Sequence, residues 1–169
     1  VHGGVRIHQP DHRQAARTAA LVLQARNVSL ADVFEARTII EPAAVRNVAQ
    51  GRGRAAAARE LRVLIAEQAA VIHDPDAFGK VNARFHERLV SLAGNQTLTI
   101  LAEMLNEIVS RAVTNATHVP GEDSLATRRR GIRSQHKLVE LITAGDGAAA
   151  EEHWRSHMAV VGRVLLGQQ

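Results

Sequence analysis

The chain contains no cysteine and no tyrosine, and phenylalanine and tryptophan together make up only 2% of its residues. Without cysteine, disulfide scaffolds, thiolate metal sites and cysteine nucleophiles are excluded. So few aromatic residues also argue against a surface on which nucleic-acid bases stack. No apolar run approaches the roughly 20 residues that span a bilayer, and we expect no signal peptide because the first residues lack its apolar core. The sequence therefore predicts no membrane segment.

Basic residues outnumber acidic residues by 21 to 17, which gives a net charge of +4. All but two of the basic residues, Lys80 and Lys137, are arginine, and they are scattered along the chain. The one basic cluster is 128–130, with Arg133 after it. A solvated helix surface explains this cluster more simply than contact with nucleic acid, so charge alone does not predict a nucleic-acid-binding chain.

The residue pattern is helical throughout, because prolines are few and no segment alternates with the two-residue period of a strand. Ser29 with Asp32 resembles a capping box, and Gly94 and Gly145 are typical helix ends. Short connections between long helices favour antiparallel neighbours. We predict one all-α domain, an antiparallel bundle of about six to seven helices. The expected helices cover about residues 11–26, 30–50, 54–73, 76–93, 96–116, 124–144 and 147–166.

Residues 1–10, with the sequence VHGGVRIHQP, differ from the rest of the chain. They contain a glycine pair, alternating Val5 and Ile7, and then Pro10. This pattern is typical of the end of a β-hairpin followed by a linker, and half a hairpin is not stable alone. We interpret 1–10 as a remnant of a preceding domain and 11–169 as the helical domain.

An arginine interrupts the apolar stripe of the second predicted helix. Arg37 lies among residues of that stripe, and Glu41 follows one helical turn later. A buried unpaired arginine is very costly. Arg37 therefore needs a partner, which is either Glu41 or the anion of a ligand, and the sequence leaves both open. The stripe consists of Leu30, Val33, Phe34, Ile40, Ala44 and Val48.

Polar residues also interrupt the stripe of the fourth predicted helix. Asn82 and His86 are four residues apart, so their side chains stack on one side of the helix, beside Phe85 and Leu89. A hydrogen bond between the two inside the core is the commoner explanation for such a pair. Taken alone, the pair predicts no ligand.

Two further histidines lie on the apolar faces of the last two predicted helices. His136 stands between Ile132 and Val139, and His157 follows Trp154 by three residues. His86, His136 and His157 are each about eight to eleven residues from a turn at the end of their helix. In an antiparallel bundle these three positions lie at a similar height along the helix axes. Neutral imidazoles need several partners in a dry core, and imidazole is a common ligand of zinc and nickel. The sequence favours a metal site over a polar core network, which remains the alternative.

Three imidazoles and one amide carry no charge, so a divalent cation among them would leave the site at about +2. Arg37 would add a further positive charge. Open coordination positions beside a cation and a guanidinium suit a small carboxylate.

Three strings of the sequence resemble a known family. They are LADVFEARTIIEPAAV, NARFHERLVSLAGN, and QHKLVELITAGD followed by HWRSHM. In this order they resemble the effector-binding domain of FadR-type regulators, a subfamily of the GntR bacterial transcription factors, over about residues 12–165. The leading VHGGVRIHQPD resembles the end of the wing of a winged helix-turn-helix with its linker.

The resemblance implies an antiparallel helical bundle that forms a homodimer, is cytoplasmic, and binds a small organic acid. In many members a divalent metal sits at the base of the pocket, with zinc expected first and nickel or manganese as alternatives. The implied metal ligands are Asn82, His86, His136 and His157, and Arg37 would meet the carboxylate of the effector. Asn82 departs from the more usual aspartate, and the segment between the last two ligands is about one residue shorter than usual. His153 is the alternative metal ligand.

The resemblance implies a sensor, in which the effector changes how a DNA-binding domain that precedes this chain meets operator DNA. The chain itself lacks a recognition helix and should not bind an operator specifically. A second hypothesis is a dimerisation module with a structural metal or a polar core. A third is a metal-dependent helical-bundle enzyme, which we do not expect because no acidic residue stands clearly beside the histidines as a general base.

Overall fold

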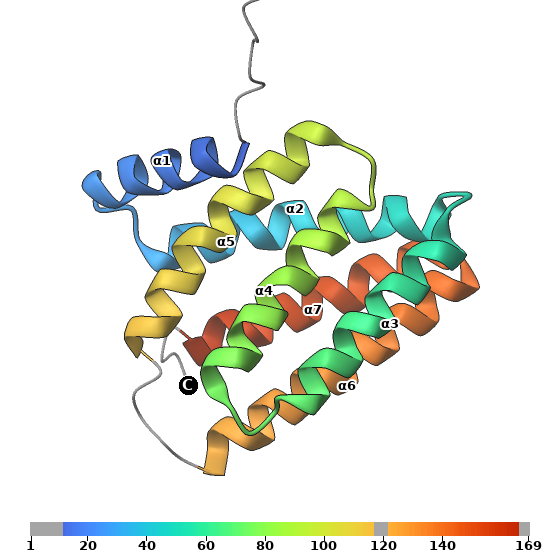
Figure 1. Ribbon diagram of the computed structural model, residues 1–169. Helices are drawn as coiled ribbons and strands as arrows, with labels where there is room; N and C mark the ends of the chain where they lie inside the picture. The colour runs from blue at the N-terminus through green and yellow to red at the C-terminus, as the bar shows by residue number, and fades with distance from the viewer. Residues whose placement is uncertain (1–11, 117–121, 166–169) are drawn as a thin grey trace, which may run out of the picture.

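The computed structural model describes residues 12–116 and 122–165, and this part of the chain forms helices without any strand (Figure 1). The predicted all-α class is confirmed. The predicted remnant at 1–10 lies outside the described residues. The helices are α1 (His12–Ala25), α2 (Leu30–Gln50), α3 (Arg54–Ala70), α4 (Pro75–Ser91), α5 (Gln96–Ala116), α6 (Glu122–Ala144) and α7 (Gly147–Leu165).

The helix ends follow local signals in the sequence. The predicted capping box is present, because Ser29 Oγ accepts from the Asp32 amide at 3.1 Å and the Asp32 carboxylate accepts from the Ser29 amide at 3.3 Å. Gly94 and Gly145 have φ angles of +77° and +78°, the left-handed conformation that glycine adopts at a helix end. α3 ends at Ala70, earlier than predicted.

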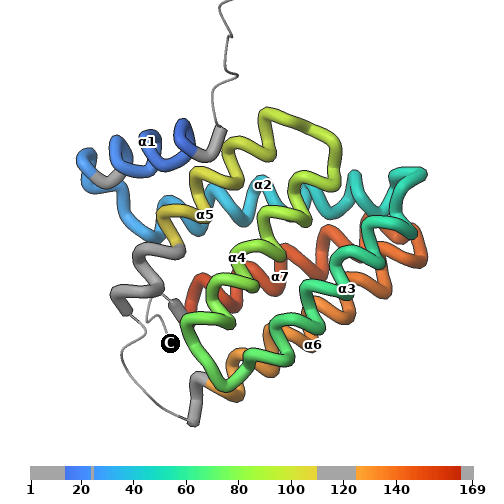
Figure 2. The backbone as a smooth tube through the Cα atoms, in the orientation of Figure 1, coloured from blue at the N-terminus to red at the C-terminus, as the bar shows by residue number. Residues whose placement is uncertain are grey.

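Figures 1 and 2 show how the helices are arranged in space. Their buried apolar side chains form one main core. α2 makes its most extensive contact with α7, α3 packs against α4 and α6, and α1 packs against α5. Trp154 of α7 is the largest fully buried side chain. Met158 of the same helix is also buried, whereas Val164 near its end is exposed.

No described helix is both long enough and apolar enough to cross a membrane.

Several polar or charged side chains are buried inside this apolar bundle. Each needs a partner, because a buried polar group without a hydrogen bond is costly. Most of them lie on the helices that surround Trp154, and they form the candidate site. The buried polar and charged residues are Arg37, Glu41, Gln68, His86, Asn106 and Gln135.

Candidate functional site

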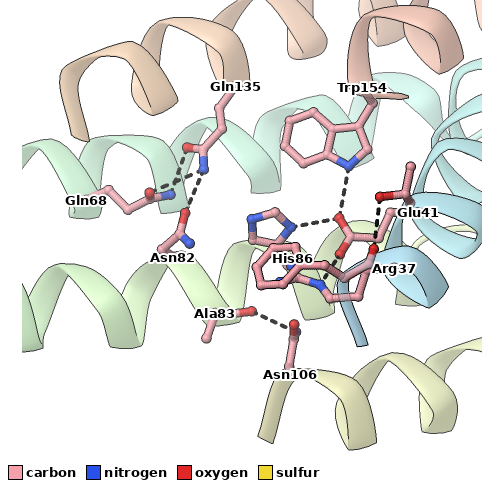
Figure 3. Close-up of polar contacts among 11 residues, drawn as sticks. Arg37, Glu41, Gln68, Asn82, Ala83, His86, Asn106, Gln135 and Trp154 are labelled. Carbon is pink, nitrogen blue, oxygen red and sulfur yellow. Dashed lines mark hydrogen bonds and ion pairs between the residues drawn. The ribbon is translucent and has the colours of Figure 1, made fainter. Parts of the chain in front are cut away.

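Three side chains converge on the buried carboxylate of Glu41, and the four residues come from three helices (Figure 3). We call Arg37, Glu41, His86 and Trp154 the charged cluster. Glu41 Oε1 accepts from Arg37 Nε at 2.8 Å. Glu41 Oε2 lies 2.7 Å from His86 Nδ1 and accepts from Trp154 Nε1 at 2.9 Å. One carboxylate thus joins α2, α4 and α7.

The environment keeps Glu41 ionised. Burial raises the pKa of this carboxyl, but the charges of Arg37 and His86 and the hydrogen bonds from His86 and Trp154 lower it, to a net value of about 2. An ionised carboxylate can only accept hydrogen bonds. His86 Nδ1 therefore carries a proton, and in the neutral ring Nε2 is an acceptor. No described residue forms a hydrogen bond with that Nε2.

Glu41 is the partner of Arg37, which settles the question that the sequence left open. The side chain is only 5% exposed, and its guanidinium carbon lies 5.4 Å from the centre of the Phe34 ring. Only Nε is used by Glu41. Within the described part of the chain, nothing accepts a hydrogen bond from the two terminal nitrogens of Arg37. These two terminal nitrogens, which bind carboxylates in bidentate fashion in proteins, are therefore available to a ligand.

His157 lies beside the charged cluster. Its ring packs on that of Trp154, with ring centres 4.5 Å apart, and the His86 ring lies 5.4 Å from the same indole. Burial, together with the nearby positive charge of His86, lowers the pKa of His157 to about 3. The imidazole is therefore neutral near pH 7.

A second group of buried side chains is made of amides from three helices (Figure 3). We call Gln68, Asn82 and Gln135 the amide cluster. Gln68 Nε2 donates to Gln135 Oε1 at 2.9 Å, and Gln135 Nε2 donates back to Gln68 Oε1 at 3.3 Å. Gln135 Nε2 also donates to Asn82 Oδ1 at 3.1 Å. The predicted hydrogen bond between Asn82 and His86 is absent among the described contacts, because each side chain has another partner.

The prediction that His136 points into the bundle is wrong. His136 is exposed, and the neighbouring Gln135 is only 1% exposed. The inward face of α6 contains Leu138 in addition to Val139 and Ile142. Each residue turns a helix by about 100°, so including Leu138 shifts the centre of the stripe away from His136 and towards Gln135.

The alternative metal ligand, His153, also has a partner. Its Nε2 lies 2.8 Å from the carbonyl oxygen of Ser134 and 3.2 Å from the hydroxyl of the same residue. A carbonyl oxygen accepts hydrogen bonds only, so this nitrogen carries the proton and is not a free metal ligand. His153 thus joins α7 to α6.

The residues present do not fit the four-ligand metal site that the resemblance implies. His136 is on the surface, and the oxygen of Asn82 already accepts a hydrogen bond. Of the predicted ligands in the described part of the chain, His86 and His157 are the imidazoles that pack on Trp154. In the part of the chain that the structure describes, no three His, Asp or Glu side chains are grouped to hold a metal ion. Metal binding itself stays a prediction.

Sequence reasoning missed three members of the two clusters. Trp154 was expected inside the bundle, but its role as a hydrogen-bond donor was not foreseen. Gln68 and Gln135 carry the same signal as Arg37, a polar residue within an apolar stripe. Gln68 follows Leu64 by four residues and Ile65 by three, which places it on the buried face of α3.

A groove of about 490 Å³ lies elsewhere, on the outer side of α3 and α4. It contains Glu60, Glu67 and Glu87, with Arg84 paired to Glu67 at 2.9 Å and Arg88 paired to Glu60. Neither Arg37 nor a histidine lines it. Its excess of carboxylates disfavours an anionic ligand.

Comparison with known proteins gives one result. The model of the FCD domain matches residues 32–160, which include both clusters and His157. No curated protein matches the chain. The match covers most of the 169 residues. The chain therefore belongs to the FCD domain family, the C-terminal effector-binding domain of FadR-type GntR regulators.

Proposed function

We propose that this chain senses a small organic acid, and that the acid binds at the charged cluster through the terminal nitrogens of Arg37. The observation that supports this most is the buried guanidinium, whose Nε is held by Glu41 while its fork has no described acceptor. Glu41 fixes the orientation of the fork without using it. A preoriented guanidinium loses little entropy when a carboxylate binds in bidentate fashion.

Charge balance around the fork sets what kind of acid fits. Glu41 cancels the charge of Arg37, and His157 is neutral because its pKa is about 3. The acid is therefore held by directional hydrogen bonds more than by net positive charge. His86 Nε2, which has no hydrogen bond with a described residue, is available to a polar group elsewhere on the same acid.

Binding at the charged cluster would also explain how the bound acid changes the conformation of the domain. The cluster joins α2, α4 and α7 through Glu41. An acid bound at Arg37 would therefore contact a junction of three helices, and we propose that it shifts them slightly. A ligand changes a conformational equilibrium only when it binds one arrangement better than another. We propose that this shift changes how a preceding DNA-binding domain is presented to operator DNA.

The homodimer and the cytoplasmic location remain part of the proposal. Two helices expose apolar side chains that could meet a second copy, with Leu21 and Val22 on α1 and Ile100 and Leu101 on α5. Apolar groups of this kind favour association between protein surfaces.

Metal and catalysis are separate questions from acid binding. A zinc ion, or nickel or manganese, at Asn82, His86 and His157 stays a prediction, and the proposed contact with Arg37 does not depend on it. An enzyme is disfavoured because Glu41, the carboxylate beside His86, has a pKa of about 2 and accepts three hydrogen bonds. Such a group is a poor general base near pH 7. A dimerisation module without a ligand is the remaining alternative.

Isothermal titration calorimetry with a panel of small mono-, di- and hydroxycarboxylic acids tests the proposal. We expect at least one acid to bind the wild-type chain, and Arg37→Lys to weaken it by about tenfold or more, because lysine keeps the charge but lacks the fork. Arg46→Lys is the matched control, since Arg46 lies on the same helix, is exposed and pairs with Glu151. Equal binding by both variants would contradict the proposed site, and no binding to the wild type would favour the dimerisation module.

A further inference from the structure

We infer that Gln135 sets the metal affinity of this site: it prevents the chain from holding a divalent cation tightly, and an imidazole or a carboxylate in its place would create that capacity. The inference concerns the site of the proposed function. It is tested with metal alone, so its outcome does not depend on whether an acid binds.

The first part of the argument is position. Gln135 and not His136 is the α6 residue that faces the interior, and its amide lies within hydrogen-bond distance of Asn82. Asn82 is one helical turn before His86 on α4, so the two side chains lie on the same side of that helix. The amide of Gln135 therefore occupies the place where the sequence predicted the third imidazole.

The second part is hydrogen bonding. A metal bound here by amide oxygens would need Asn82 Oδ1 or Gln135 Oε1 as ligands. Both oxygens already accept hydrogen bonds, from Gln135 Nε2 at 3.1 Å and from Gln68 Nε2 at 2.9 Å. A metal at either oxygen would compete with these bonds, and losing one would leave a buried N–H donor without that acceptor, which costs about 1–3 kcal/mol.

The third part is the kind and number of ligands. Zinc and nickel prefer imidazole nitrogen to an uncharged amide oxygen. Among the described residues, the imidazoles that pack on Trp154 are those of His86 and His157, and two such ligands fall short of the three protein ligands typical of catalytic zinc sites. One further strong ligand is what the site lacks.

The fourth part is that the rest of the site is already arranged for a metal. Glu41 Oε2 lies 2.7 Å from Nδ1 of His86, so Nε2 is the ring nitrogen outside this contact. A carboxylate that orients a histidine in this way is a common outer partner in metal sites. His157 packs on the same indole as His86, with its ring centre 4.5 Å from that of Trp154. A single replacement at position 135 should therefore be enough.

The experiment is titration of the metal-stripped 169-residue chain with Zn²⁺ and with Co²⁺, followed by competition with a chelator and by Co²⁺ visible absorption. The variants are wild type, Gln135→His, Gln135→Glu and the exposed control His136→Gln. Gln135→Glu keeps the volume of the side chain and decides the question if Gln135→His fails to fold, which circular dichroism will show.

We expect the wild type and His136→Gln to bind both ions weakly and alike. A folded Gln135→His or Gln135→Glu should bind at least about tenfold more tightly, since even the loss of an outer partner changes metal affinity by 10–100-fold. Co²⁺ bound by these variants should show the absorption of protein-nitrogen coordination. The inference is overturned if the wild type already binds stoichiometric metal as tightly as the variants, if folded variants gain nothing, or if His136→Gln lowers the affinity.

Discussion

The charged cluster and the amide cluster are both buried, polar and built from three helices, but they differ in how they are held together. In the charged cluster, three donors converge on the one ionised carboxylate of Glu41. In the amide cluster, uncharged Gln68 and Gln135 pair with each other, and Gln135 also reaches Asn82. The first cannot lose its acceptor without leaving a buried charge, whereas the second can be replaced by apolar groups at much lower cost.

We propose different tasks for the two clusters. The charged cluster fixes donors and acceptors in one orientation, which suits recognition of an anion. In the amide cluster the members bind one another, and we propose that Gln135 stands where a metal ligand would be needed. Changes that disrupt each cluster separately should therefore have different energetic and chemical consequences.

The largest effect on stability is expected at Glu41. Glu41→Gln removes the negative charge opposite buried Arg37, and breaking such a pair costs about 3–5 kcal/mol. Urea unfolding followed by circular dichroism measures the change. Glu35→Gln is the control, because Glu35 is an exposed residue of the same helix and should change stability by less than about 0.5 kcal/mol. Equal costs for the two variants would show that the charged cluster contributes no special stability.

Acid should destabilise the fold through the same region. The folded-state pKa of His157 is lowered from 6.5 to about 3, so between these values the unfolded chain binds a proton that the folded chain does not. The contribution of His157 to the free energy of unfolding is full above pH 6.5. It decreases as the pH falls towards 3, by about 1 kcal/mol for each pH unit. Glu41 adds a further loss as the pH falls from 4.5 towards 2. Urea unfolding from pH 7 to pH 4 measures the slope, which His157→Gln should flatten; an unchanged slope would contradict the neutral state of this imidazole.

The amide cluster should tolerate apolar replacement best when two members change together. Gln68→Leu alone leaves both polar atoms of Gln135 without that partner and should cost about 1–3 kcal/mol. The double variant Gln68→Leu with Gln135→Leu should cost clearly less than the sum of the single variants. A double-mutant cycle by urea unfolding checks this, and additive costs would mean that the two amides do not act as a pair.

Much of the fold could be predicted because its signals are local. The capping box at Ser29 and the glycine helix ends at Gly94 and Gly145 depend only on nearby residues, and the structure confirms them. The inward positions of Arg37 and His86 also followed from periodicity and are confirmed. Periodicity could not decide which of two neighbouring residues on α6 faces the interior. Gln135 and His136 stand four and three residues before Val139, so both fit the helical spacing. The packing of α6 against α3, with the hydrogen bonds from Gln135 to Gln68 and Asn82, accompanies the inward position of Gln135.

Partners across helices were likewise beyond the sequence. Arg37 and Glu41 are four residues apart on one helix, so their pairing was one of two options. The bonds from Trp154 to Glu41 and from Gln68 to Gln135 join residues 113 and 67 positions apart, and no local pattern encodes them. The candidate site could therefore be located from the sequence, but its chemistry could not.

The most direct test of the proposed site is NMR of the chain labelled with ¹⁵N-arginine, during titration with the first acid that binds in calorimetry. Arg37→Lys assigns the Arg37 signals. We predict that the terminal nitrogen signals of Arg37 shift and become protected from solvent exchange, while its Nε signal stays close to its position because Glu41 retains that bond. Saturating acid that leaves every Arg37 signal unchanged would place the ligand elsewhere and contradict the account.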